Sequence, residues 1–316
     1  MDVLYLGSAS DLRELVLSGH CIAFVGAGLS HPPAHMWWEL VDKIAQGCHV
    51  LPAQGGSDDR RGLWKEVIDQ CIEKDEEACN RILKEEFPQH TATARTAMTY
   101  VYQLPFRALF TTNFDPWVWQ LRNREHYQEL HVYPDLPLYN GQSSHVYYLH
   151  GRFMSEDLNA SVRQLVFGQR SFDEAYGRSL LPGLLLHAFV YGNVLFIGFD
   201  PTEICVASLL RHSIGIRGAI EASQPGMRHS LGRRYALWPE PEGLEPAEQA
   251  IQDERIRQIC SLEVTPVLYN REANDYSGLE RGLANWVEKR DLQQRKDPFP
   301  TGFGVASERP TGEKQT

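Results

Sequence analysis

The sequence predicts an α/β fold, in which a doubly wound parallel sheet carries a helical insertion module. Three observations predict this fold. Apolar runs of strand length recur along the chain, helical periodicity follows most of them, and the first run ends in two closely spaced glycines. Continuous apolar strands that alternate with helices are typical of a parallel sheet covered on both faces.

Seven segments have the length and the apolar composition of buried strands. They span residues 21–26, 107–112, 129–133, 146–150, 193–198, 234–238 and 262–268. Several of them end in glycine or a polar residue, and the ligand crevice of an open parallel sheet lies beyond the carboxyl ends of its strands. We therefore expect functional residues directly after these strands.

Helical periodicity fills the gaps between the strands. Helices are expected at residues 37–46, 64–72, 76–87, 93–102, 172–190, 203–212, 247–260 and 279–290. The stretch between the first two strands is too long for one crossover helix, so we interpret about residues 40–105 as a helical insertion. Residues 219–234 are rich in Gly, Ser, Arg and Pro and predict a mobile loop. Residues 1–290 are expected to form one domain, and residues 291–316 a disordered tail.

The charge of the chain disfavours a nucleic-acid-binding function. The formal net charge is −10 at pH 7, whereas affinity for phosphates comes from clustered Lys and Arg. One local basic group, formed by Arg228, Arg233 and Arg234, is more typical of a solvated loop. We expect no direct contact with nucleic acid.

The sequence also gives no indication of membrane insertion or of a metal site. Charged residues interrupt the N-terminal segment, unlike a signal peptide, and the apolar run at residues 180–186 is much shorter than the ~20 residues that span a bilayer. None of the six cysteines forms a Cys-x-x-Cys pair, so we expect neither a zinc ribbon nor a redox motif. Free thiols, no metal ion and a cytoplasmic location are the resulting expectations.

The first motif that could carry chemistry directly follows the first strand. It reads Gly26-Ala27-Gly28-Leu29-Ser30. Two glycines after a buried strand allow a tight turn and bring backbone N–H groups close to a pyrophosphate. The dinucleotide fingerprint would place a third glycine where this chain has His31. A simple strand-to-helix turn is the alternative interpretation.

Asn113 and Asp115 form the second motif, at the end of the strand at residues 107–112. Two residues apart on such a loop, both side chains can face one ligand. The structural alternative is capping, since either residue could begin a helix that continues with Pro116 and Trp117. Both interpretations can hold for different side chains.

The third and fourth motifs are His150-Gly151 and Gly198-Phe199-Asp200. Histidine titrates nearest to neutral pH, which suits acid–base catalysis, although a lone histidine is more often a packed or surface residue. For Asp200 the alternative is a turn with a helix cap, in which Pro201 takes the first helical position. Each motif is weak alone, and their shared position at strand ends is what predicts a site.

In this order, the motifs resemble the sirtuin family, especially its bacterial sirtuin-like branch. The resemblance covers roughly residues 15–290. It rests on Phe24-Val-Gly-Ala-Gly28-Leu-Ser30, Thr112-Asn113-Phe114-Asp115, Leu149-His150-Gly151, Phe196-Ile-Gly198-Phe199, Arg234-Tyr-Ala-Leu-Trp-Pro239 and Glu263-Val-Thr-Pro-Val.

The resemblance implies a Rossmann-like fold and an NAD⁺ site. By this analogy Asn113 orients water or ribose, Asp115 contacts the ribose or the carboxamide, and His150 is the base. The implied NAD⁺-binding residues are Gly26, Ala27, Gly28, Ser30, Thr112, Gly198 and Asp200. Two of these positions depart from the family pattern, since Thr112 replaces the glutamine of the deacetylases and Asp200 stands where related chains commonly have serine.

Further departures disfavour a protein deacetylase, because the chain lacks the four zinc-binding cysteines of that branch and has a different sequence after Ser30. The resemblance implies instead an NAD⁺ hydrolase that depletes NAD⁺ in anti-phage defence. A separate ATPase or Argonaute-like sensor, or assembly into a homo-oligomer, would control it. The alternatives are a protein deacylase or ADP-ribosyltransferase, and a non-catalytic sensor of NAD⁺ or ADP-ribose.

Overall fold

The computed structural model of the protein describes residues 3–30, 37–50, 57–87, 96–137, 144–157, 159–241, 243–271 and 277–296. Its centre is an eight-stranded sheet with the order β1-β8-β7-β6-β2-β3-β5-β4, and all of its strand pairs are parallel. The strands are β1 (Leu4–Tyr5), β2 (Cys21–Val25), β3 (Ala108–Thr111), β4 (Glu129–Val132), β5 (His145–Tyr148), β6 (Asn193–Ile197), β7 (Arg234–Pro241) and β8 (Thr265–Arg271). The predicted α/β fold with a parallel sheet is confirmed.

Helices cover both faces of the sheet. The α-helices are α1 (Ser10–Leu17), α2 (Ala27–Ser30), α3 (Trp37–Gly47), α4 (Ser57–Glu86), α5 (Thr96–Gln103), α6 (Trp117–Leu121), α7 (Gln169–Gly177), α8 (Leu181–Tyr191), α9 (Ile204–Ser223), α10 (Pro246–Ser261) and α11 (Ser277–Lys296). Among the described residues, the 3₁₀ helices η1 (Val162–Gln164) and η2 (Pro225–Ser230) lie between them.

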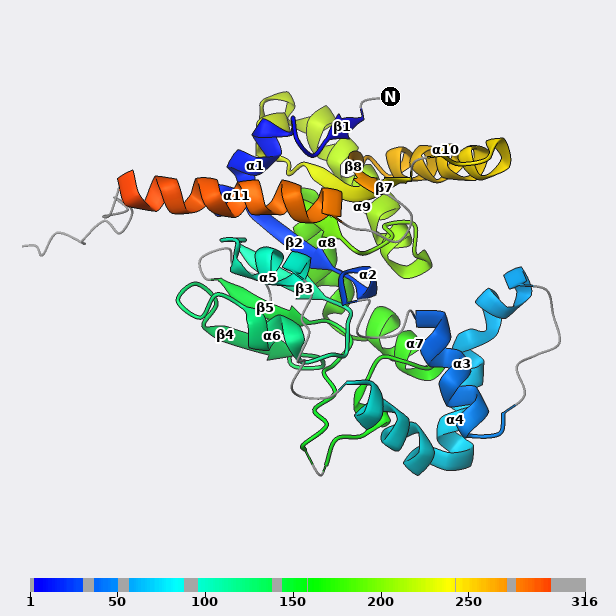
Figure 1. Ribbon diagram of the computed structural model, residues 1–316. Helices are drawn as coiled ribbons and strands as arrows, with labels where there is room; N and C mark the ends of the chain where they lie inside the picture. Colours follow the sequence, from blue (N-terminus) through cyan, green and yellow to red (C-terminus); the bar gives the residue numbers. More distant parts are fainter. Residues whose placement is uncertain are drawn as a thin grey trace, which may run out of the picture.

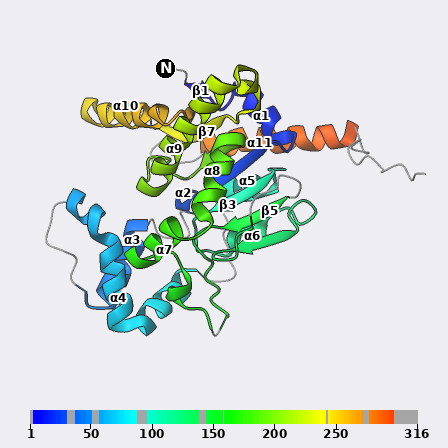
Figure 2. The same cartoon turned by 180° about the vertical axis from the view of Figure 1, so that it is seen from behind.

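The buried side chains of β2 show how the two layers form. Ala23 and Val25 belong to the core beneath α1, α5, α6 and α11, whereas Ile22 and Phe24 belong to the core beneath α7, α8, α9 and α10. Successive strand residues point to opposite faces, so an all-apolar strand feeds both cores. In Figure 1, α5 and α11 lie in front of the sheet, and in Figure 2, α8 and α9 do.

The helical insertion forms a lobe of α3 and α4 beside the sheet, next to α7 (Figures 1 and 2). Helix α4 contains a break at Asp75, where φ is −156° and ψ is 80°, so it corresponds to the two helices expected at residues 64–72 and 76–87. Helix α5, which was expected within the insertion, packs against α11 over the sheet instead. The lobe is therefore smaller than the stretch assigned to it.

The order of the strands defines a switch point between β2 and β6. From β2 the chain continues to β3, β4 and β5 on one side of the sheet, and from β6 it continues to β7 and β8 on the other. In a doubly wound sheet, a crevice opens beyond the carboxyl ends of the two strands at which the winding reverses. This arrangement directs attention to the residues that follow β2 and β6.

Several predicted boundaries are wrong. The single helix expected at residues 172–190 is two helices, because α7 ends at Gly177 and α8 begins at Leu181. The loop expected at residues 219–234 contains the end of α9 and the helix η2. The side chain of Arg217 holds these segments together, since its Nη1 donates to the carbonyl of Gly232 at 2.6 Å.

The two ends of the chain also differ from expectation. Strand β1 and helix α1 were not predicted, because a two-residue strand shows no periodicity. The tail expected from residue 291 begins inside α11, which continues to Lys296. Residues 297–316 lie outside the described residues.

The basic group at residues 228–234 is divided, because Arg233 is exposed and Arg234 is buried. Arg234 is 3% exposed, and its guanidinium donates to Ser213 Oγ at 2.7 Å and to Glu263 Oε2 at 2.6 Å. This buried arginine links β7 to α9 and to the start of β8. The side chain of Arg228 lies outside the described residues.

The six cysteines are all free, as expected. The thiols of Cys48 and Cys79 are 3.4 Å apart in the lobe. In the part of the chain that the structure describes, no helix is both long enough and apolar enough to cross a bilayer.

Candidate functional site

The four predicted motifs lie at one edge of the sheet. Strands β6, β2, β3 and β5 are neighbours in that order, and one motif follows each of them. The motifs after β2 and β3 are in direct contact through side chains, and those after β2 and β6 through the backbone, as described below. The structure thus brings together residues that are more than 170 positions apart in the sequence.

Ser30, Asn113 and Asp115 form a continuous hydrogen-bonded chain. The amide of Asn113 donates from Nδ2 to Ser30 Oγ at 3.0 Å, and Ser30 Oγ donates to Asp115 Oδ2 at 3.0 Å. The backbone N–H of Asn113 also donates to Thr111 Oγ1 at 3.0 Å, which fixes the loop after β3. All three side chains of the chain are buried, so their geometry is set by these contacts. Thr112 lies beside them and is half-buried.

Asp115 also begins helix α6. Its Oδ1 accepts a hydrogen bond from the backbone N–H of Trp117 at 3.0 Å, which is the capping interpretation. Burial raises the pKa of Asp115 to about 6, although the hydrogen bonds from Trp117, Ser30 and Asn113 act in the opposite direction. Both carboxylate oxygens are therefore occupied within the protein, and Asp115 positions Ser30 and Asn113.

The glycines after β2 and β6 allow two loops to pack backbone against backbone. The N–H of Gly28 donates to the carbonyl of Gly198 at 2.9 Å, and the N–H of Gly26 donates to that of Ile197 at 3.0 Å. A Cβ at Gly26 would lie 2.6 Å from the Gly198 oxygen, and one at Gly28 would lie 2.9 Å from it. The two amides are thus committed within the protein, and phosphate binding by Gly26, Ala27 and Gly28 stays a prediction.

His150 is buried and contacts α7. Its Nε2 lies 2.8 Å from the hydroxyl oxygen of Tyr176, and its ring packs edge-on against Phe172. Burial, and to a lesser extent the charge of Lys65, lowers the pKa of His150 to about 3. The imidazole is therefore neutral at pH 7 and a weak base in this conformation, because an efficient base has a pKa near the working pH.

Lys65 and Tyr176 are the site residues that sequence reasoning missed. Lys65 comes from α4 in the lobe, and its Nζ lies 3.8 Å from the centre of the Phe172 ring and 3.7 Å from Cys205 Sγ. No local pattern identifies either residue, since both reach His150 only through the packing of α4 and α7. The lobe thus contributes a charge to the surroundings of His150.

An aromatic cluster joins the lobe to the loops at this edge. The ring of Trp37 lies 4.9 Å from that of Trp64, 5.7 Å from Phe114 and 5.1 Å from Phe167. Phe114 stands between Asn113 and Asp115 in the sequence. Because these rings pack beside the buried polar residues, the lobe closes this part of the edge.

Asp200 has a structural role in the turn after β6. Its Oδ1 accepts hydrogen bonds from the backbone N–H and the hydroxyl of Thr202, and its Oδ2 lies 3.3 Å from Arg255 of α10. It does not cap the next helix, as the alternative interpretation expected, because Glu203 Oε2 accepts from the first N–H groups of α9. Whether Asp200 contacts a ribose stays a prediction.

A model of a known protein family matches part of the chain. Residues 107–259 match the family model described as the SIR2-like domain. No curated protein matches the chain. The match runs from the start of β3 to α10, so it includes Asn113, Asp115, His150 and Gly198, but the loop at residues 26–30 lies outside it.

A SIR2-like domain supports an enzymatic function related to NAD⁺. The structure agrees in two respects: the glycine loops approach each other at the switch point, and a buried polar network lies at the carboxyl ends of the strands. The absence of cysteine pairs gave no reason to expect a metal ion. However, a Glu and two His side chains gather elsewhere in the segment that the family model matches.

Proposed function

We propose that the chain hydrolyses NAD⁺ to nicotinamide and ADP-ribose at the edge where β2, β3, β5 and β6 end. The observation that carries this proposal is the hydrogen-bonded chain Asn113–Ser30–Asp115, which joins the carboxyl end of β2 to that of β3, the first strand of the segment matched by the SIR2-like model. In the reaction, water attacks C1′ of the nicotinamide ribose and the C1′–N bond breaks. The bonding electrons leave with nicotinamide, and the water gives up one proton.

The transition state of such a cleavage carries oxocarbenium-like charge on the ribose. Asn113 orients the ribose or the attacking water, and Ser30 holds its amide in place. Asp115 holds the hydroxyl of Ser30 in place, and its ionised carboxylate supplies a negative charge beside Ser30 and Asn113. His150 accepts the proton of the water or of a ribose hydroxyl. Correct orientation of the reactants is a large part of the rate enhancement that such a site provides.

The structure supports a resting state that must open. Asn113 and His150 are each 7% exposed, so the dinucleotide reaches them only if neighbouring groups move. The lobe is the neighbour that carries Trp37 and Lys65, and Lys65 contributes to the low pKa of His150. Displacement of α3 and α4 would expose the residues at the carboxyl ends of the strands. It would also remove the charge of Lys65 and so raise the pKa of His150.

A resting state of this kind fits the wider proposal that the enzyme depletes NAD⁺ in anti-phage defence. An NAD⁺ hydrolase that is active at all times would harm its own cell, so the activity needs a trigger. A partner such as an ATPase or Argonaute-like sensor, or assembly into a homo-oligomer, would supply it by moving the lobe.

One observation favours a second candidate, a sensor that binds NAD⁺ or ADP-ribose without cleaving it. A pKa of about 3 makes His150 a poor proton acceptor at neutral pH. In a sensor this residue would have a packing role alone, and NAD⁺ would remain intact after binding.

The deciding experiment measures nicotinamide and ADP-ribose released from NAD⁺ by the purified chain, without an acylated peptide. We expect equal amounts of both products, and a loss on the order of 10²–10⁴-fold in His150→Ala. Asn113→Ala should also be inactive. His212→Ala, an exposed histidine on α9, is the matched control and should retain full activity.

The assay is repeated at high protein concentration and with the products of neighbouring genes, because a trigger can be required. Binding of NAD⁺ without cleavage under all of these conditions would exclude the hydrolase and support the sensor. Turnover that depends on an acyl-lysine peptide, or label transferred to protein, would replace the hydrolase with a deacylase or an ADP-ribosyltransferase.

A further inference from the structure

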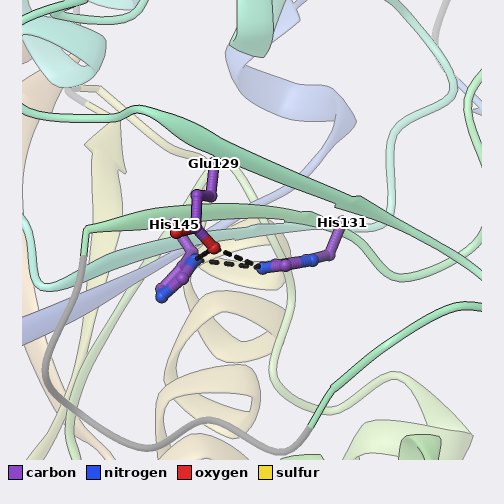
Figure 3. A group of neighbouring side chains, drawn as sticks. All are labelled: Glu129, His131 and His145. Carbon is purple, nitrogen blue, oxygen red and sulfur yellow. Dashed lines mark hydrogen bonds and ion pairs between the residues drawn. The ribbon is translucent and has the colours of Figure 1, made fainter.

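Three side chains with metal-ligand atoms converge at the start of β4 and β5 (Figure 3). The Nε2 of His131 lies 3.0 Å from the Nδ1 of His145. The Oε2 of Glu129 lies 3.2 Å from the Nδ1 of His145 and 3.7 Å from the Nε2 of His131. Each of the three residues therefore directs one potential ligand atom to a common point.

The register of the sheet produces this convergence. Glu129 and His145 are direct partners across the parallel pair β4–β5, and neighbouring strands are about 4.7–4.9 Å apart. His131 lies two residues after Glu129, so it points to the same face of the sheet. His145 is the first residue of β5, and His150 lies two residues beyond the end of this strand, which by itself spans about 10 Å at 3.3 Å per residue. The cluster is thus separate from the candidate NAD⁺ site.

We propose that Glu129, His131 and His145 form a binding site for a zinc ion, with water as the fourth ligand. Imidazole nitrogen and carboxylate oxygen are both ligands of Zn²⁺, and two histidines with one glutamate leave a fourth position open. Magnesium and calcium prefer oxygen ligands alone, so they fit this set poorly.

The separations of the three atoms match tetrahedral zinc. Ligand atoms at about 2.0–2.1 Å from the ion in tetrahedral geometry lie about 3.3–3.4 Å from one another. The observed separations of 3.0, 3.2 and 3.7 Å scatter about that value. An ion about 2 Å from all three atoms lies slightly outside their plane, and the open position points away from that plane.

Aromatic packing orients the two imidazoles of the cluster. The ring of Tyr147, which is 1% exposed, packs 4.8 Å from the ring of His131 and 5.8 Å from that of His145. Glu129 is 60% exposed on its side chain, so the ion and its water have a route from solvent.

The ion would fasten the edge of the sheet. Strand β4 has four residues and pairs only with β5 among the described strands. Glu129 and His131 lie on β4 and His145 on β5, so one ion bridges the two strands. We therefore expect zinc to stabilise the folded chain, since a ligand that binds only the folded state raises its melting temperature.

The test uses the full chain after treatment with a chelator, and zinc binding is measured by titration calorimetry without NAD⁺. We expect one zinc ion per chain and a higher Tm with zinc. Cobalt(II) in place of zinc should give the intense visible absorption of a tetrahedral site. Because the assay contains no NAD⁺ and measures no turnover, its result does not depend on the proposed hydrolase activity.

Glu129→Gln is the most informative variant, because the side chain of Glu129 is exposed and the substitution should leave the fold intact. It should weaken zinc binding by at least about 10–100-fold and abolish the rise in Tm, as should His131→Ala. His212→Ala should bind zinc as the wild type does. Equal zinc affinity in Glu129→Gln, His131→Ala and the wild type, or no zinc binding by the wild type, would overturn the proposal. The three side chains would then form only a hydrogen-bonded group.

Cysteines are the competing ligands, and cobalt distinguishes them. Burial raises the pKa of the thiols of Cys71 and Cys79 well above the ordinary range, so they are protonated at neutral pH. A strong sulfur-to-cobalt charge-transfer band in the near ultraviolet would show cysteine ligation and overturn the proposal.

Discussion

The Nε2 atom of His150 lies 2.8 Å from the hydroxyl oxygen of Tyr176, and this contact joins the end of β5 to helix α7. Burial raises the pKa of Tyr176 well above its usual value, so the phenol keeps its proton. The pKa of His150 is low, so the imidazole is neutral. With the phenol as donor, Nε2 accepts, and Nδ1 carries the ring proton.

Tyr176→Phe should raise the pKa of His150. The neutral imidazole loses a hydrogen bond worth about 0.5–1.5 kcal/mol, which corresponds to a rise of about 0.5–1 pKa unit. NMR titration of the His150 ring measures this change. Tyr191→Phe, at an exposed position on α8, is the control, and an unchanged pKa in Tyr176→Phe would show that the hydroxyl does not bind the ring.

Lys65→Met should also raise the pKa of His150, because it removes a positive charge while an apolar chain remains against Phe172. This rise should make up the smaller part of the difference between the pKa of His150 and that of an ordinary histidine, because burial is the main cause of that difference. Lys65→Arg keeps the charge and should leave the titration near that of the wild type. If Lys65→Met and Lys65→Arg titrate alike, the lobe exerts no electrostatic control over His150.

The ionisation of Asp115 should destabilise the fold as the pH rises past about 6. Its pKa is about 6 in the folded chain and ordinarily 3.8, so its favourable contribution is complete below about pH 3.8 and is lost as pH rises through about 6. At 1.36 kcal/mol per pKa unit, the loss is about 3 kcal/mol.

Asp115→Asn imitates the protonated carboxyl and should not show this loss. Denaturant unfolding at pH 3.5 and pH 7.5 gives the free energy of unfolding of both proteins. We expect the wild type to lose about 3 kcal/mol relative to the variant between these pH values. A constant difference between the two proteins would mean that the pKa of Asp115 is the same in the folded and the unfolded chain.

Gly198→Ala should destabilise the switch point. Gly198 has a φ of +61°, and an added Cβ would lie 2.3 Å from the backbone nitrogen of Leu29. We expect a loss of about 1–3 kcal/mol in the free energy of unfolding, from backbone strain and the collision. Gly183→Ala, in α8 with open space around it, is the matched control and should stabilise by about 0.5–1 kcal/mol. Equal stability of the two variants would contradict the close approach of the loops.

The sequence could predict the sheet and the four strand-end motifs, because both depend on local composition. In a parallel sheet, ligands bind beyond the carboxyl ends of the strands. The direction of an apolar strand followed by Gly26 or Asn113 is therefore enough to place these residues at the ligand edge. Lys65 was out of reach, since it lies 85 residues before His150 and meets its surroundings through the packing of α4.

The convergence of Glu129, His131 and His145 was equally hidden. It depends on which residue of β4 pairs with which residue of β5, and a change of one residue in register would turn Glu129 and His131 to the opposite face from His145. The loop expected at residues 219–234 shows the opposite error. Its composition suggested irregular structure, but the contact of Arg217 with Gly232 orders it.

The position of β2 has a practical consequence for dividing the chain. Strand β2 pairs with β3 on one side and with β6 on the other, yet it lies outside the segment matched by the SIR2-like family model. A fragment of residues 107–259 would therefore lose the middle of its own sheet. The unpaired edges of β3 and β6 would be open to pairing with other molecules, so such a fragment should be insoluble even though every residue of the recognised family segment is present.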